Sequence, residues 1–342
     1  MSALTAPAGP GESPAARRLP DHGSGRLARA VLRWETLLVL VAALVFVLNS
    51  FASPYFLNPW NLSDATFNFT EKAMIAFAMT LVIVSGEIDL SVASTIALAS
   101  VAMGAAAEAG LGTPALVLVG LGVGLLCGAF NGALVAGLGL PSIVATIGTL
   151  SLFRGLAYVA LGDGAYTAYP PDFAVFGQGY VWWVITWEMV AFVLFALLFG
   201  ALLHATVFGR WVFAIGNNPV GARFSGIRVG RVKFVLFLLS GVMSGVAAVF
   251  LTSRLGSTRP SIAFGWELEV VTMVVLGGVA ILGGSGTILG VSLAAVILGL
   301  ITFGLGLLNV PGVVMQIVVG FLLIAVIALP NLLGALRRGR TA

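Results

Sequence analysis

Residues 120–137 read GLGVGLLCGAFNGALVAG, an apolar stretch without a charged side chain. A row of glycines at four-residue spacing runs through it: Gly120, Gly124, Gly128 and Gly132. Residues four apart share one face of a helix, and in a membrane a glycine face lets another backbone approach closely. Asn131 lies beside this row, where an amide either hydrogen-bonds to a neighbouring helix or lines a polar path. The stretch therefore predicts a transmembrane helix packed tightly against a second helix.

The composition of the 342-residue chain indicates the same class. Hydrophobic residues make up 59% and charged residues only 9%, whereas soluble globular proteins carry about 25% charged residues. Too little charge is present to cover a soluble surface, so soluble enzymes, nucleic-acid-binding proteins and disordered chains are excluded. The net charge of +4 is explained by membrane topology and contact with anionic lipids. An integral membrane protein remains.

Hydropathy predicts an all-α polytopic membrane protein with about ten transmembrane helices, some of them short or broken. The predicted spans are 36–52, 72–85, 92–109, 114–138, 143–161, 181–208, 234–251, 270–282, 288–308 and 313–329. The second and eighth are shorter than the roughly 20 residues that cross a bilayer straight. We expect these two to be broken or re-entrant.

The basic residues predict the orientation of these spans. Of the 17 Lys and Arg residues, 13 lie within 17–33, 210–233 and 337–340, and such residues are held on the cytoplasmic side. Six spans before the middle group and four after it place all three groups together, with both termini cytoplasmic. The predicted organisation is a disordered basic tail at 1–34, not a signal peptide, a transmembrane domain at 35–335 and a basic cytoplasmic end at 336–342.

The segment 86–91, read as GEIDLS, places two carboxylates inside an otherwise apolar run. Buried charge is costly unless it is paired or hydrated. One interpretation is a broken helix that borders a translocation path. The other is a tight turn at the cytoplasmic interface, in which Asp89 and Ser91 cap a helix beginning at Val92. Capping does not explain Glu87.

The loop 209–233 is the longest hydrophilic segment after the tail, and it carries five positive charges. It combines a turn signal at 217–219 with a short helical run at 220–225 that Gly226 ends. A short helix on the cytoplasmic surface is either a docking element or a plain connector. Because five charges exceed what orientation requires, we favour docking.

A pair of similar loops suggests internal symmetry. The sequence LPSIV at 140–144 resembles VPGVV at 310–314, and the predicted topology places these loops on opposite sides of the membrane. Two inverted five-helix halves would produce this pattern, and many transporters place their path between such halves.

Arg154 and Glu188 are charged residues within predicted spans, and each needs a partner or a route to water. Arg154 either extends outward along its helix or meets a carboxylate, and Glu188 is a possible partner. On the external side, Arg254 and Arg259 are basic exceptions among acidic residues.

The signatures of catalysis are missing from the sequence. The chain has one cysteine, Cys127, which excludes an intramolecular disulfide and a cysteine-rich metal site. The sequence contains neither a His-Glu-x-x-His zinc motif nor a Gly-x-x-x-x-Gly-Lys-Ser/Thr phosphate loop. We therefore predict no enzyme activity and no metal site in this chain.

Four blocks resemble the membrane permeases of ribose-type monosaccharide ABC importers, a family that includes those for autoinducer-2 and rhamnose. The blocks are 86–94, 131–155, 214–227 and 276–287. The likeness extends over residues 36–335. Glu87 stands where glycine is usual in the family, and the stretch 252–260 is most similar to the autoinducer-2 and rhamnose branch.

This resemblance implies a division of labour. An extracytoplasmic sugar-binding protein captures the sugar, two permeases, identical or paralogous, form the path, and two ATPase domains, supplied by an ABC ATPase subunit, drive transport. The resemblance implies no cofactor in this chain, with ATP and Mg bound by the partner ATPase. It also implies location in the bacterial plasma (inner) membrane, among its lipids.

Three groups of candidate site residues follow. The ATPase-coupling loop is assigned Gly216, Asn217, Asn218, Ala222, Arg223 and Gly226. The translocation path or hinge is assigned Glu87, Asp89, Ser91, Asn131, Thr146 and Thr149. External contact with the binding protein is assigned Arg254 and Arg259.

The sequence thus predicts a permease subunit that imports a monosaccharide or a related polyol-like molecule by alternating access. Autoinducer-2 or a rhamnose-like sugar is favoured. The alternatives are a secondary carrier or channel without an ATPase partner, and a membrane scaffold without a transported substrate. Co-purification with a nucleotide-binding partner separates the first two.

Overall fold

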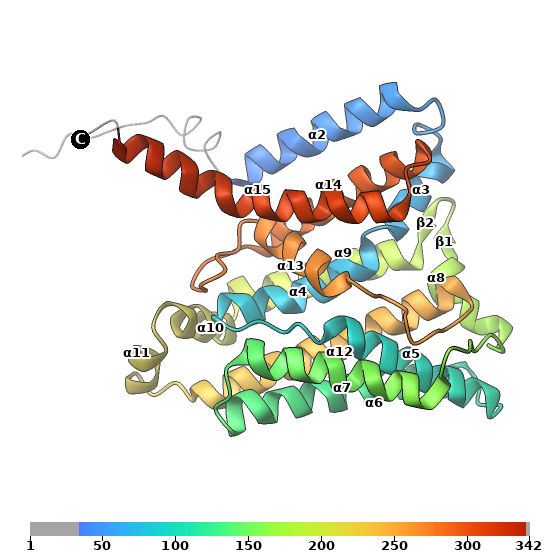
Figure 1. The fold of residues 1–342 in the computed structure, drawn as a ribbon, viewed down its shortest axis with the longest axis horizontal. Coiled ribbons are helices and arrows are strands. Elements are labelled where there is room, and N and C mark those ends of the chain that lie inside the picture. Colours follow the sequence, from blue (N-terminus) through green and yellow to red (C-terminus); the bar gives the residue numbers. More distant parts are fainter. Residues whose placement is uncertain (1–33, 340–342) are drawn as a thin grey trace, which may run out of the picture.

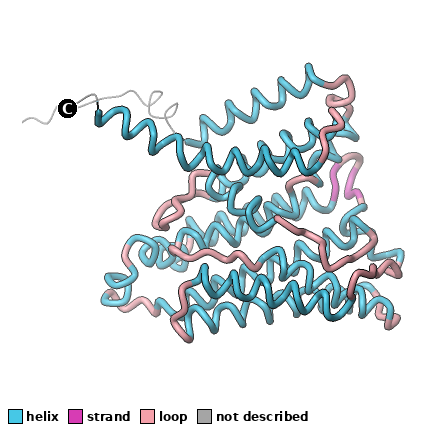
Figure 2. Tube along the Cα trace, viewed as in Figure 1, coloured by secondary structure: helices cyan, strands magenta, loops and turns pink. Residues whose placement is uncertain are grey.

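The computed structural model describes residues 34–339, which form an almost entirely helical molecule (Figures 1 and 2). The tail 1–34 therefore lies, but for Trp34, outside the described residues, as do the last residues of the predicted end 336–342. Most of the long helices run side by side along the long axis of Figure 1. Helices suit apolar segments in a membrane, because a helix satisfies its own backbone hydrogen-bonding groups. The all-α prediction is confirmed.

The first half of the chain contains α2 (Trp34–Ala52), α3 (Pro59–Phe67), α4 (Thr70–Val84), α5 (Val92–Glu108), α6 (Thr113–Gly132), a π-helical turn η1 (Ala133–Gly137) and α7 (Ser142–Leu161). The second half contains η2 (Pro171–Ala174), α8 (Val175–Gln178), β1 (Tyr180–Trp182), β2 (Ile185–Thr186), α9 (Trp187–Ala205), α10 (Val207–Asn217), α11 (Pro219–Phe224), α12 (Val229–Leu255), α13 (Trp266–Leu276), α14 (Ile288–Leu307) and α15 (Gly312–Gly339).

Every predicted span overlaps a helix, but the helices differ in length. Within the described residues, six helices are long and apolar enough to cross a membrane, or seven if α3 and α4, bent by 43° at their junction, count as one span. The shorter apolar helices are Val92–Glu108 and Gly312–Ala325. The predicted start of the sixth span at residue 181 is wrong, because β1 and β2 form a small antiparallel hairpin there and α9 begins only at Trp187.

The glycine row of α6 packs directly against α12. A Cβ atom at Gly124 would overlap the carbonyl oxygen of Gly241, and one at Gly128 would lie 2.5 Å from the carbonyl oxygen of Phe237. Gly241 and Gly245 supply the matching smooth face on α12. The predicted close approach of a second backbone is confirmed, and Asn131 beside the glycine row is buried.

Candidate transport site

The segment 85–91, between α4 and α5, is non-helical and contacts α6, α7 and α12, with Ser85, Asp89 and Ser91 buried. Asp89 is 2% exposed. Its carboxylate accepts hydrogen bonds from the backbone N–H and hydroxyl of Ser91 at 3.0 and 2.7 Å, and from the hydroxyl of Ser240 on α12 at 2.8 Å. A buried carboxylate is tolerated only when such donors replace water. Asp89 therefore connects the broken segment to α12.

Asn131 extends this network to α6. Its amide nitrogen donates to the hydroxyl of Ser91 at 2.7 Å, while its Oδ1 has no hydrogen-bond partner within the described part of the chain. Helix α5 begins at Val92 as predicted, but the expected cap is wrong in detail. The hydroxyl of Ser91 donates to Asp89 and accepts from Asn131, and it makes no capping hydrogen bond to the first turn of α5.

Helix α7 satisfies the backbone of the same segment. The hydroxyl of Ser142 accepts from the N–H of Ile88 at 3.2 Å, and the hydroxyl of Thr146 donates to its carbonyl at 3.3 Å. Thr149 lies one turn further along and donates to the carbonyl of Thr146. The structure thus gathers four of the six predicted path residues, Asp89, Ser91, Asn131 and Thr146, around this non-helical segment, with Thr149 next to them.

Glu87, the sixth, faces the N-terminal end of α12. It forms an ion pair with Lys233, and both side chains are mostly buried. Lys233 is the last residue of the predicted coupling loop, so this pair joins the loop to the broken segment. The pair accounts for a carboxylate that capping left unexplained.

The loop itself folds as predicted into a turn and a short helix. Asn218 begins α11 by accepting a hydrogen bond from the N–H of Gly221 at 2.8 Å. After α11, Gly226 has φ +85°, which favours glycine, so the chain can turn toward α12. Ala222 is buried, whereas Arg223 is exposed.

The end of α10, within the predicted coupling loop, packs against the end of α4. The N–H of Gly284 donates to the carbonyl of Val84 at 2.8 Å, and the side-chain amide of Asn217 donates to the carbonyl of Gly284 at 3.2 Å. Gly216 sits against both partners so closely that a Cβ atom there would overlap the carbonyl oxygen of Val84. The end of α10 therefore cannot move without moving the end of α4, which leads directly into Asp89.

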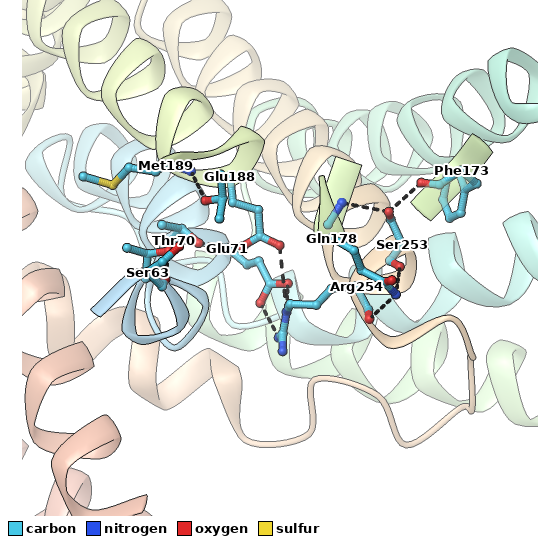
Figure 3. A network of polar contacts seen from close by, with 12 residues as sticks. Ser63, Thr70, Glu71, Phe173, Gln178, Glu188, Met189, Ser253 and Arg254 are labelled. Carbon is cyan, nitrogen blue, oxygen red and sulfur yellow. Dashed lines mark hydrogen bonds and ion pairs between the residues drawn. The ribbon is translucent and has the colours of Figure 1, made fainter. Parts of the chain in front are cut away.

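A second polar cluster lies at the opposite ends of α4 and α12 (Figure 3). Arg254 makes a two-pronged ion pair with Glu71, with distances of 2.9 and 2.8 Å. Its Nε also lies 3.8 Å from Oε1 of Glu188, and the other oxygen of Glu188 accepts from Thr70 at 2.7 Å. Both carboxylates are almost completely buried. One guanidinium thus holds two buried acids together.

The suggested pairing of Arg154 with Glu188 is wrong, because Arg254 occupies that position. Arg154 instead donates to the carbonyls of Pro260 and Ile262, at 2.6 and 2.8 Å. These carbonyls belong to the non-helical segment before α13. Helix α7 thereby supports both broken segments, one through Thr146 and one through Arg154.

The external candidates differ in their surroundings. Arg259 is exposed, as a partner contact requires, and within the described residues it forms no ion pair. Arg254 already directs its guanidinium inward to Glu71, although a quarter of its side chain remains exposed. Nearby, Tyr169 donates to the hydroxyl of Thr258 at 2.8 Å. Burial raises the pKa of Tyr169 to about 12, so the phenol remains a neutral donor to the loop that contains Thr258.

Sequence reasoning missed three members of these clusters: Lys233, Ser240 and Glu71. Ser240 and Ser244 lie four residues apart in the apolar helix α12, and that spacing was an available signal for a polar face. Glu71 and Arg254 are 183 positions apart in the sequence, so no local sequence pattern predicts their ion pair.

Residues 61–327 match the family described as the permease component of branched-chain amino acid transport systems. The chain belongs to this permease family. A relative named autoinducer 2 import system permease protein LsrD, from Enterobacter sp. (strain 638), is 35% identical over 302 residues, covering 86% of this chain and 92% of the relative. Proteins of the same name from Klebsiella pneumoniae and Photorhabdus laumondii are also 35% identical and are covered to 91% and 89%.

No solved structure matches the permease. The family description names branched-chain amino acids, whereas the names of the similar relatives concern autoinducer 2. The predicted likeness to ribose-type ABC permeases is confirmed. The permease is a multi-pass protein of the inner membrane and a transport subunit of an importer.

Proposed function

We propose that this permease carries autoinducer-2, or a closely related sugar, through an importer driven by a separate ATPase. Its similarity to autoinducer 2 import permeases over most of both chains supports this substrate. The buried hydroxyls and amide around Asp89 supply the donors and acceptors that a polyol-like molecule requires. Glu87, Asp89, Ser91, Asn131, Thr146 and Thr149 remain our candidates for the path or its hinge.

The contact between Gly216 and Val84 is the observation that carries the coupling part of this proposal. Helix α11 exposes 64% of Val220 and 90% of Phe224, an apolar pair suited to a cleft on a partner. Force applied to α11 reaches the end of α4 through Gly216 and Asn217, and the start of α12 through the pair of Lys233 with Glu87. Both routes converge on the segment that holds Asp89.

The complete importer in this proposal has further subunits. The ATPase binds ATP and Mg and docks on α11, while a sugar-binding protein approaches the opposite side near Arg259. A second permease, identical or paralogous, completes the path. Both termini lie in the cytoplasm, as the distribution of Lys and Arg favours. ATPase closure then shifts the chain between two orientations of one central site.

A bulky side chain in the docking loop is expected to uncouple ATP hydrolysis from transport. Ala222→Trp adds volume to a buried position, and Gly226→Val forces a branched residue into a conformation that favours glycine. We expect each variant to lower ATP-driven uptake into proteoliposomes at least tenfold, about 1.4 kcal/mol of lost coupling. Capture of ligand by the binding protein is expected to remain unchanged.

Gly122→Val provides the control, because that glycine of α6 has open space around it. Normal uptake by Ala222→Trp and Gly226→Val would show that α11 is a connector. A carrier or channel without an ATPase is the alternative function. It predicts that the permease purifies from its native membrane without a nucleotide-binding subunit and transports without ATP.

A further inference from the structure

The predicted coupling loop, residues 209–233, also lines a cavity that the proposed docking of α11 does not use. A cavity of about 420 Å³ lies behind α11, between α10 and the start of α12. Its lining is Trp211, Ser225, Gly226, Ile227, Arg228, Arg231 and Val232. Arg228 directly precedes α12 and Arg231 lies in its first turn, and both line the cavity. The guanidinium groups of Arg228 and Arg231 and the indole of Trp211 thus line the same cavity.

Arg228 and Arg231 form no ion pair within the described residues 34–339. Residues 189–266 contain no Asp or Glu. Of the five basic residues in 209–233, only Lys233 forms an ion pair within the described part of the chain. Two guanidinium groups side by side without a carboxylate favour an anionic ligand, and guanidinium forks match phosphate oxygens in geometry.

The position of the cavity indicates that the anion is the headgroup of a lipid. Helix α12 has 27 residues, which span about 40 Å against a hydrocarbon core of about 30 Å. Its first turn, with Arg231 and the preceding Arg228, therefore extends into the headgroup layer. Helix α10 follows the membrane-spanning α9 directly and exposes half of Val207 and 41% of Trp211. An exposed tryptophan beside arginines is typical of the membrane interface.

We propose that the phosphate of an anionic phospholipid, such as phosphatidylglycerol, binds in this cavity between Arg228 and Arg231, with Trp211 against its glycerol backbone. The lipid would occupy the membrane side of the coupling segment, while Val220 and Phe224 of α11 remain available to the ATPase. This inference requires only that the permease lies in a membrane, and it is independent of the transported sugar.

The test is native mass spectrometry of the full-length permease, delipidated in detergent and titrated with phosphatidylglycerol or phosphatidylcholine. We expect the permease to retain one phosphatidylglycerol in preference to phosphatidylcholine. The double variant Arg228→Gln, Arg231→Gln is expected to bind phosphatidylglycerol at least tenfold more weakly, since each basic residue near an anionic lipid surface contributes about a factor of five. The variant with lysine at both positions should retain most of the binding.

Arg210→Gln, Arg223→Gln is the matched control, because it removes the same charge from exposed arginines outside the cavity. Equal losses in both double variants would show diffuse attraction and overturn the site, as would unchanged binding in Arg228→Gln, Arg231→Gln. Displacement of the lipid by inorganic phosphate would mean a free-anion site instead. If the Gln variant kept its lipid but lost the co-purifying ATPase, the arginines would belong to a protein interface. Thermal melting of each variant in detergent identifies any that fail to fold, and then the single variant Arg228→Gln replaces the double one.

Discussion

Replacing Gly124 with leucine is expected to prevent stable folding of the permease. The glycine faces of α6 and α12 touch so closely that any side chain at Gly124 would meet the backbone at Gly241. Neither backbone can retreat without separating the helices that carry Asn131 and Ser240, so the Asp89 network would break as well. Overpacking of a tight contact costs about 1–3 kcal/mol and occasionally more. We expect the upper end of this range, seen as a lower melting temperature and a loss of monodisperse protein in gel filtration.

Gly122→Leu separates this packing effect from a general intolerance of leucine in α6. The two glycines are two residues apart, so they face opposite sides of the helix, and no atom lies within 4 Å of a Cβ at Gly122. The melting temperature of the Gly122→Leu variant is expected to match that of the unmodified permease. If Gly124→Leu melted at the same temperature as Gly122→Leu, the described contact between α6 and α12 would be incorrect.

Arg254→Leu is expected to be the most damaging change at the C-terminal end of α12. It removes the only cation that contacts Glu71 and Glu188 within the described residues, and both acids are almost fully buried. Removing one member of a buried ion pair costs about 3–5 kcal/mol, because the remaining charge has neither water nor a partner. Thermal unfolding in detergent should show this loss directly.

A second change distinguishes lost charge pairing from lost packing. Adding Glu71→Gln and Glu188→Gln to Arg254→Leu removes the unpaired charges and is expected to restore part of the lost stability. Arg259→Leu, an exposed arginine five residues away, should leave the melting temperature unchanged. If the triple variant unfolded as easily as Arg254→Leu alone, the ion pairs would not be the cause.

The parts of the structure that follow from local spacing were accessible from the sequence. The α6 glycine row predicted a tight helix contact because one backbone period determines which residues share a face. The short helix α11 followed from the Asn-Pro start and the glycine after it, since these residues satisfy or terminate a helix within a few positions. The hairpin before α9 was missed because its residues are as apolar as those of the following helix.

The polar networks could not be predicted in the same way. Glu87 and Lys233 are 146 positions apart, and Asp89 and Ser240 are 151 apart. Their pairing depends on how α4, α7 and α12 cross, and hydropathy does not encode those crossings. The sequence suggested Arg154 as the partner of Glu188, whereas the structure has Arg254 there, for the same reason. The sequence predicted that these charges need partners, but only the fold determines which partner each one has.

ATP hydrolysis by the reconstituted importer is the most direct test of coupling through this permease. The permease would be placed in lipid nanodiscs with its ATPase, and the binding protein added with autoinducer-2, pentoses or deoxyhexoses in turn. We predict that the binding protein loaded with autoinducer-2 or a closely related sugar stimulates hydrolysis, and that Gly226→Val abolishes the link between hydrolysis and uptake. Unchanged hydrolysis with every ligand, or uptake that continues without the ATPase, would contradict the account.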